Sequence, residues 1–267
     1  MGSATFFDAF DALSLAFVLP ILIGLWHLSA VEIGFLIAAS YVGQLAGALL
    51  FSRLAEQYGR IRGAAAAIAI MSVMSLGCAL AGNFPVLFLC RLVQGIGVGG
   101  EMPVAATYIS ELSRARGRGR FFLLYEMIFP VGLMATGQIG TLLVPLLGWK
   151  IMFLIGGIPG LIICVLVMRL PESPRWLMSR GRLAEAEAIV RQVEASTPRR
   201  LPADPAGPAP SAGPRPTLAE PQRSRWSELL SPFYRQRSLI VWTLWASAYL
   251  VSNSLNNWMP TLYKTIY

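Results

Sequence analysis

Charged residues are scarce in this 267-residue chain, at 13% of the total against 55% hydrophobic residues. Soluble globular domains carry about 25% charged residues, so the composition argues against a soluble enzyme. Histidine and cysteine are also rare. The only histidine is His27, and the three cysteines lie singly inside apolar runs, at Cys78, Cys90 and Cys164. Without CxxC spacing or a second histidine, we expect no metal site, no disulfide and no cofactor.

Long apolar runs dominate what remains. A membrane-spanning helix needs about 20 predominantly apolar residues, and seven segments meet that requirement. They are residues 5–27, 33–52, 63–81, 85–110, 121–147, 151–169 and 239–259. The sequence therefore predicts an all-α polytopic membrane protein embedded in a lipid bilayer.

Basic residues follow the predicted topology. Three connections on one side of the predicted membrane, residues 52–62, 113–120 and 169–237, hold 19 of the 22 lysines and arginines. Cytoplasmic loops carry such an excess, so the N-terminus and the long loop are predicted to be cytoplasmic. This distribution also explains the basic pI of about 9.9 without any binding to nucleic acid.

The pattern divides the chain into parts. Residues 1–170 form a bundle of six predicted spans, and residues 171–237 form a cytoplasmic loop. Within the loop, residues 183–195 have one apolar helical face, whereas residues 198–222 contain eight prolines and read as a linker. Residues 238–267 hold the seventh span. Seven spans leave a second half without its partners, so we expect an N-terminal fragment that lacks further C-terminal helices.

Ionisable residues inside the predicted spans are the first functional candidates, because a charge inside a bilayer is costly and usually marks a pathway. Asp8 and Asp11 share one helical face, and two carboxylates so close resist double ionisation. Such a pair suits uptake and release of a proton. Arg91 is a natural partner for Asp11. The alternatives are that the aspartates lie among the cytoplasmic headgroups and that Arg91 extends to the outer interface.

Two further acids, Glu101 and Glu126, are predicted to bind substrate or to titrate, with a purely structural buried acid as the alternative. Residues 95–100, GIGVGG, match the glycine pattern of a dinucleotide-binding turn. That pattern requires a following strand, and apolar helix follows here instead. We therefore interpret these glycines as a surface on which helices pack closely.

Three stretches carry a family resemblance. RLVQGIGVGGEMPVAATYISEL at 91–112, PESPRWL at 171–177 and SRLAEQYGRIR at 52–62 resemble motifs of sugar-porter-type members of the major facilitator superfamily. FFDAFD and GGEMPVA are similar to segments of the niacin and aromatic-acid metabolite:proton symporters within that group. The resemblance implies a six-helix N-terminal half of a major facilitator fold, followed by the seventh helix.

The resemblance also implies roles for individual residues. Asp11 and Arg91 match a proton-coupling pair, with Asp8 beside them. A cytoplasmic gating network is implied at Arg60, Glu111, Arg118, Glu172 and Arg175. Sugar porters place a glutamine where Glu126 stands, and of their seventh-helix polar residues only Asn253 is retained. Glu101, Glu126 and Asn253 are therefore expected to line the substrate path, for an organic or aromatic acid rather than a sugar.

The function predicted from these residues is proton-coupled secondary active transport of a small metabolite across the bacterial cytoplasmic membrane, with no enzymatic activity. One alternative is a sugar transporter or facilitator of the same superfamily. Others are a membrane sensor on the same fold and, from GIGVGG alone, a dinucleotide enzyme.

Overall fold

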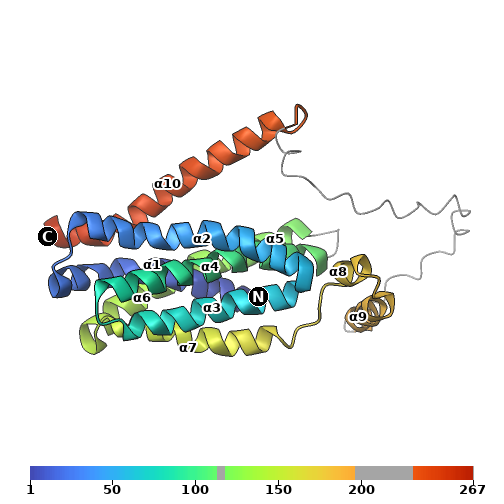
Figure 1. The fold of residues 1–267 in the computed structure, drawn as a ribbon, viewed down its shortest axis with the longest axis horizontal. Helices are drawn as coiled ribbons and strands as arrows, with labels where there is room; N and C mark the ends of the chain where they lie inside the picture. The colour runs from blue at the N-terminus through green and yellow to red at the C-terminus, as the bar shows by residue number, and fades with distance from the viewer. Residues whose placement is uncertain (113–117, 196–230, 267) are drawn as a thin grey trace, which may run out of the picture. The chain divides into compact units, whose positions relative to one another are not determined.

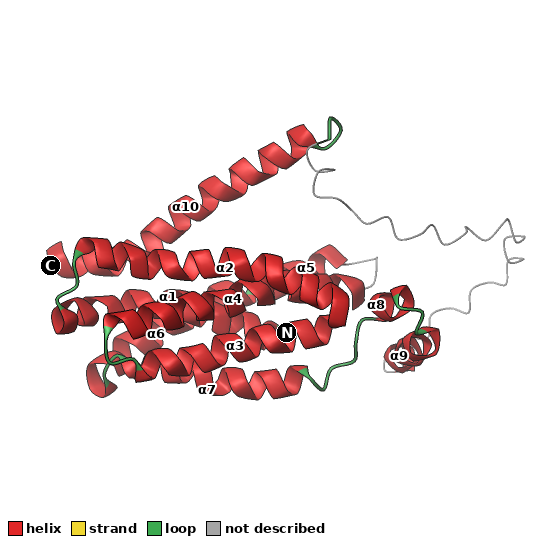
Figure 2. Ribbon diagram, in the orientation of Figure 1, coloured by secondary structure: helices red, strands yellow, loops and turns green. Residues whose placement is uncertain are grey.

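A computed structural model describes residues 1–112, 118–195 and 231–266, without the side chains of residues 118, 120, 121, 194, 253 and 256–266. The predicted linker at 198–222 lies outside these residues. The described chain is helical and contains no strand (Figures 1 and 2), which confirms the all-α prediction. Six of its segments are long and apolar enough to cross a membrane. They are α1 (Gly2–Trp26), α2 (Ala30–Tyr58), α3 (Arg60–Leu80), α4 (Phe84–Leu112), the continuous stretch Phe122–Leu147 and α7 (Lys150–Val167).

Local chemistry sets the ends of α2. Ser29 precedes the helix, and its hydroxyl accepts a hydrogen bond from the backbone N–H of Glu32 at 3.3 Å. The Glu32 carboxylate accepts one in return from the Ser29 backbone N–H at 2.8 Å, which completes a capping box. At the other end Gly59 has φ 115°, a conformation that favours glycine. The chain therefore turns from α2 directly into α3.

The stretch Phe122–Leu147 is interrupted near Met127, which separates α5 (Arg118–Glu126) from α6 (Ile128–Leu147). Pro130 explains the position of the break. Proline has no N–H to bond the carbonyl four residues earlier, and its ring clashes with that carbonyl. The affected carbonyl is that of Glu126, the last residue of α5.

The GIGVGG stretch lies inside α4, where its glycines contact two neighbouring helices. A Cβ atom built on Gly97 would lie 2.6 Å from the carbonyl oxygen of Ala67 in α3. A Cβ on Gly95 would lie 3.0 Å from the carbonyl carbon of Ser40 in α2. No side chain fits at these distances, so the glycines allow the backbones to approach closely. The stretch is a packing surface within a continuous helix, as the sequence predicted.

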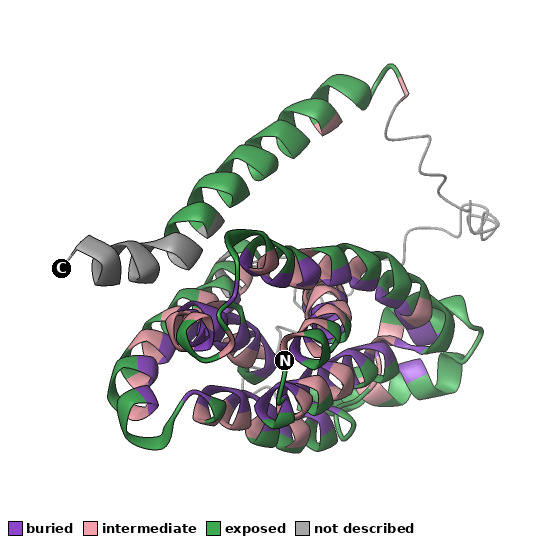
Figure 3. Ribbon diagram, turned by 60° about the vertical axis from the view of Figure 1, so that its left-hand side comes forward, coloured by how far each residue is buried: buried purple, intermediate pink, exposed green. Residues whose placement is uncertain are grey.

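The bundle core consists of two apolar clusters with a polar layer between them. One cluster is built around Phe51, Ile68 and Met71, and the other around Phe10 and Phe153. Buried residues lie on the inner faces of the bundle helices (Figure 3). Along α1, α3, α4 and α6 the run of buried apolar residues is broken by buried polar side chains, at Thr5, Asp8, Asp11, Ser14, Ser72, Ser75, Arg91, Gln94, Glu101 and Thr136. This layer is where the candidate site lies.

Three further helices follow the bundle. α8 (Pro174–Ser179) and α9 (Leu183–Ala195) share a small core in which Trp176 and Leu177 pack against Ala186. α9 coincides with the predicted amphipathic helix. α10 (Arg235–Ile266) covers the predicted seventh span. It is not among the six candidate spans found in the described residues, because its polar run at 252–257 lowers its hydropathy.

Candidate functional site

Asp11 lies at the centre of the polar layer, on α1, with 2% of its surface exposed. The hydroxyl of Ser75, on α3, lies 3.3 Å from Asp11 Oδ1. The side-chain amide of Gln94, on α4, donates to Asp11 Oδ2. On the remaining side, a Cβ built on Gly156 of α7 would lie 2.9 Å from Asp11 Oδ1, so this glycine leaves room for the carboxylate. Four helices therefore enclose one carboxyl group.

Arg91 lies one turn before Gln94 on the same face of α4 and is 4% exposed. Its Nη1 donates to Gln94 Oε1 at 3.0 Å, and its Nη2 donates to the Ser14 hydroxyl at 3.3 Å. The guanidinium carbon lies 4.9 Å from the centre of the Phe153 ring, within the range of a cation–π contact. Arg91 is thereby held inside the bundle and does not extend to the outer interface.

The predicted pairing of Asp11 with Arg91 is indirect in the structure. Among the described residues no ion pair joins the two side chains; Nη1 reaches only the backbone oxygen of Asp11, at 3.5 Å. Gln94 bridges the two charges, since its amide donates to the carboxylate while its carbonyl accepts from the guanidinium. α1 begins at Gly2, three residues earlier than predicted. The offset between α1 and α4 brings Asp11 to the level of Arg91.

This arrangement suits a carboxyl group that changes its charge. Burial in an apolar bundle disfavours an ionised carboxylate, whereas a nearby fixed positive charge and hydrogen-bond donors favour it. Asp11 experiences both influences. Gln94 contacts both charges and so connects the Asp11 carboxylate on α1 to the Arg91 guanidinium on α4.

A second polar cluster lies one turn earlier on α1. Asp8 and Glu101 are 1% and 0% exposed, and their side chains interact with one another. None of their four carboxylate oxygens has a partner in full hydrogen-bond geometry among the described residues, although the Thr5 hydroxyl interacts with Glu101. Beside them, the hydroxyls of Thr5 and Tyr125 are hydrogen-bonded to each other at 2.6 Å. The structure thus brings Asp8 and Glu101 together in the interior of the bundle.

The other two predicted substrate-path residues are placed differently. Glu126 is exposed at the end of α5, next to the break between α5 and α6. The side chain of Asn253 lies outside the described residues. The roles of both residues stay predictions.

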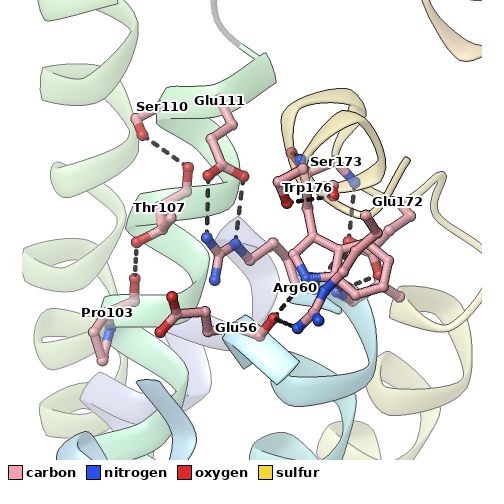
Figure 4. Close-up of polar contacts among 12 residues, drawn as sticks. Glu56, Arg60, Pro103, Thr107, Ser110, Glu111, Glu172, Ser173 and Trp176 are labelled. Carbon is pink, nitrogen blue, oxygen red and sulfur yellow. Dashed lines mark hydrogen bonds and ion pairs between the residues drawn. The ribbon is translucent and has the colours of Figure 1, made fainter. Parts of the chain in front are cut away.

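Three of the five predicted gating residues lie together. Arg60, at the start of α3, pairs with Glu111 at the end of α4, with Nη2 and Oε1 3.3 Å apart (Figure 4). Glu172 accepts a hydrogen bond from the backbone N–H of Arg60 at 2.9 Å. This carboxylate is placed at the N-terminus of α3, where the helix dipole stabilises negative charge. Arg175 is exposed and forms no ion pair within the described ranges, and the side chain of Arg118 lies outside them.

The structure adds contacts to this cytoplasmic cluster that the sequence did not indicate. The indole N–H of Trp176 donates to the backbone carbonyl of Glu56 at 2.8 Å (Figure 4). Arg180 Nη2 donates to the same carbonyl at 2.8 Å. α8 is therefore attached to the C-terminal end of α2 through backbone oxygens, so the Glu56 side chain is not required for the contact.

Sequence reasoning also missed Gln94, Ser75 and Gly156 in the central site. A signal for Gln94 was present, because a glutamine three residues after Arg91 shares its helical face inside an apolar helix. Ser75 and Gly156 lie on other helices, and nothing in their local sequence distinguishes them. The described residues contain no group of three or more His, Cys, Asp or Glu side chains able to hold a metal ion.

Comparison with known proteins is consistent with this geometry. Residues 7–267 match the family described as "Sugar (and other) transporter". The chain is 32% identical to the niacin transporter NiaP of Acinetobacter baylyi, over 98% of this chain and 58% of that protein. It is 31% identical to the 4-hydroxybenzoate transporter PcaK of Pseudomonas aeruginosa, over 97% of this chain and 56% of that protein. The chain thus spans little more than half the length of these relatives.

Solved structures show the same fold. The structure of the major facilitator superfamily proton:xylose symporter XylE, bound to 6-bromo-6-deoxy-D-glucose, matches with a TM-score of 0.67 at 25% identity. The match covers 72% of this chain and 48% of that one. The chain therefore belongs to the sugar (and other) transporter family of the major facilitator superfamily.

Proposed function

We propose that the protein is a proton-coupled secondary active transporter that moves a small metabolite by alternating access. The observation that carries this proposal is the buried chain of contacts from Asp11 through Gln94 to Arg91. A group that binds and releases a proton must be shielded from bulk water yet linked to a part of the protein that moves. Asp11 is shielded, and its charge is linked to α4. In this scheme Asp11 carries the proton, and Arg91 balances its charge after release.

The substrate we propose is an organic or aromatic acid. The named substrates of two similar transporters, niacin and 4-hydroxybenzoate, are of this kind. A hexose needs many neutral hydrogen-bonding groups, and an acid at Glu126 replaces one of them. The second candidate is a sugar, which the fold match to a xylose symporter favours.

The cytoplasmic cluster is proposed to act as a gate. Arg60 and Glu111 are 18% and 13% exposed at their side chains, so water reaches the pair and screens it. Such pairs contribute about 1 kcal/mol or less, and a pair of this strength can be broken and formed again in each cycle. The proposal places this cluster, the N-terminus and the loop at 171–237 in the cytoplasm of a bacterial cell. In the same proposal, residues 1–170 belong to the N-terminal half of the transporter and residues 238–267 to its C-terminal half.

Uptake by cells that express the full-length protein tests the function. Labelled niacin, 4-hydroxybenzoate and xylose are supplied with and without an imposed pH gradient, acidic outside. We expect gradient-driven accumulation of an aromatic acid, abolished in Asp11→Asn and retained in Glu187→Gln, which removes an exposed acid on α9. Uptake that does not depend on the pH gradient would show that the protein is a facilitator and not a symporter. Accumulation of xylose alone would show that the substrate is a sugar.

A further inference from the structure

The Asp8–Glu101 pair is not used by the mechanism proposed above. Both side chains are buried, on α1 and α4 respectively. They interact with one another, and Glu101 also interacts with the Thr5 hydroxyl. None of their four oxygens, however, has a partner in full hydrogen-bond geometry among the described residues. Buried polar groups in native proteins are nearly always hydrogen-bonded, so this arrangement requires an explanation.

The surroundings of the pair do not supply a counter-charge from a side chain. No lysine or arginine of the described ranges forms an ion pair with either carboxylate. The ionisable groups that interact with them electrostatically are the amino group of Met1 and the side chains of Asp11, Tyr125 and Glu126. Two of these four groups, Asp11 and Glu126, are further acids, and the protonated phenol of Tyr125 carries no charge.

Protonation resolves the difficulty. Ionised carboxylates are acceptors only, so two of them cannot bond each other. When one carries a proton, its O–H donates to the other, and both groups gain a partner inside the bundle. Two like charges this close and this far from water also resist simultaneous ionisation. A single shared proton therefore satisfies hydrogen bonding and electrostatics together.

Asp11 does not serve this purpose for the pair. Its Oδ2 already has a donor in the Gln94 amide. Its Oδ1 lies 3.3 Å from the Ser75 hydroxyl, whose single proton is shared with the Phe153 carbonyl oxygen at 2.9 Å. Asp11 lies three residues after Asp8, on the same face of α1. The two sites thus have separate hydrogen-bond partners while still influencing each other through charge.

We propose that Asp8 and Glu101 share one proton and form a second proton-binding site, distinct from Asp11. The site deepens the proposed function and rests on it for its role: a cycle that empties both sites carries two protons with each substrate. More positive charge would then cross the membrane with each substrate molecule than a single proton-binding site allows.

Infrared difference spectroscopy tests the site directly, because it detects protonated carboxyl groups as the pH is varied, without substrate or gradient. In the purified full-length protein we expect two titrating buried carboxyl groups. Asp11→Asn should leave one of them. Glu101→Gln and Asp8→Asn should each remove the shared one, since the introduced amide donates to the remaining carboxylate and lets it ionise. Glu187→Gln, which removes an exposed acid on α9, should retain both signals.

Several results would overturn the proposal. Survival of the pair's signal in Glu101→Gln would overturn it. So would loss of the signal in only one of Glu101→Gln and Asp8→Asn. Either result would place the proton on a single residue. Thermal unfolding of each variant, including Asp8→Asn/Glu101→Gln, separates loss of the site from loss of fold. A variant with additional residues ahead of Met1 removes the amino group from its position near Glu101, and so tests whether this charge affects the signal. If uptake proves independent of pH while both signals are present, the proposed function fails and the proton site stands.

Discussion

Replacement of Gln94 by leucine is the substitution most specific to the geometry of the site. Gln94 is 1% exposed and joins a carboxylate to a guanidinium through one donated and one accepted hydrogen bond. Leucine has a similar size and can make neither bond. Hydrogen bonds to charged groups contribute about 1.5–3 kcal/mol each, so Gln94→Leu removes about 3–6 kcal/mol before the structure relaxes.

The loss should appear in two measurements. Thermal unfolding of the purified protein should occur at a lower temperature, because Asp11 and Arg91 each lose a buried partner. Uptake driven by a pH gradient should fall by about tenfold or more, since even one such bond corresponds to a change of roughly that size in an equilibrium. Gln94→Glu keeps an acceptor for Arg91 but places a second carboxylate against Asp11, so uptake should fall here as well.

Gln138→Leu is the matched control, because Gln138 is an exposed glutamine on α6 and its side chain makes no hydrogen bond among the described residues. It should unfold and transport as the unmodified protein does. If Gln94→Leu were indistinguishable from Gln138→Leu in both assays, the bridge between the two charges would have no functional meaning. Loss of stability with full uptake would assign Gln94 to packing alone.

Three more substitutions test other parts of the structure. Gly156→Ala adds a methyl group 2.9 Å from the Asp11 carboxylate; displacement of the carboxylate should lower pH-driven uptake severalfold, measured at equal amounts of protein in the membrane. Arg60→Glu should weaken gating by placing like charges together, and the exchange Arg60→Glu/Glu111→Arg should restore part of the uptake rate. The hydrogen bond from Arg182 lowers the pKa of Glu185 below its ordinary value of 4.5. The stabilisation of α9 is thus present at neutral pH and lost as the pH falls through that lowered value; circular dichroism of a peptide covering 171–195 should show this acid transition, reduced in Glu185→Gln.

Much of the fold was accessible from the sequence, because bilayer thickness fixes the length of each apolar run. The predicted spans and the observed helices agree within a few residues at most ends. Larger differences are at α10, predicted over 239–259 and observed over Arg235–Ile266, and at α2, predicted to end at residue 52 and observed to continue to Tyr58. The polar turns that follow Phe51 are helical because helices extend beyond the hydrocarbon region into water, where hydropathy carries no information about them.

The candidate site was accessible only in part. A buried charge stands out in an apolar run, so Asp8, Asp11, Arg91 and Glu101 were all identified. The bridge through Gln94 was not, since it depends on the offset between α1 and α4. That offset is set by close packing of many helices and not by any one segment. The pairing of Asp8 with Glu101 depends on the same packing.

The central claim is that transport is coupled to a proton carried on Asp11, and proton movement itself tests it most directly. Full-length protein is reconstituted in vesicles with a pH-sensitive dye inside and no initial pH gradient, and niacin or 4-hydroxybenzoate is added outside. We expect the interior to become acidic as substrate enters, and we expect no such acidification in Asp11→Asn. Substrate entry without acidification, or acidification that persists in Asp11→Asn, would contradict the central claim.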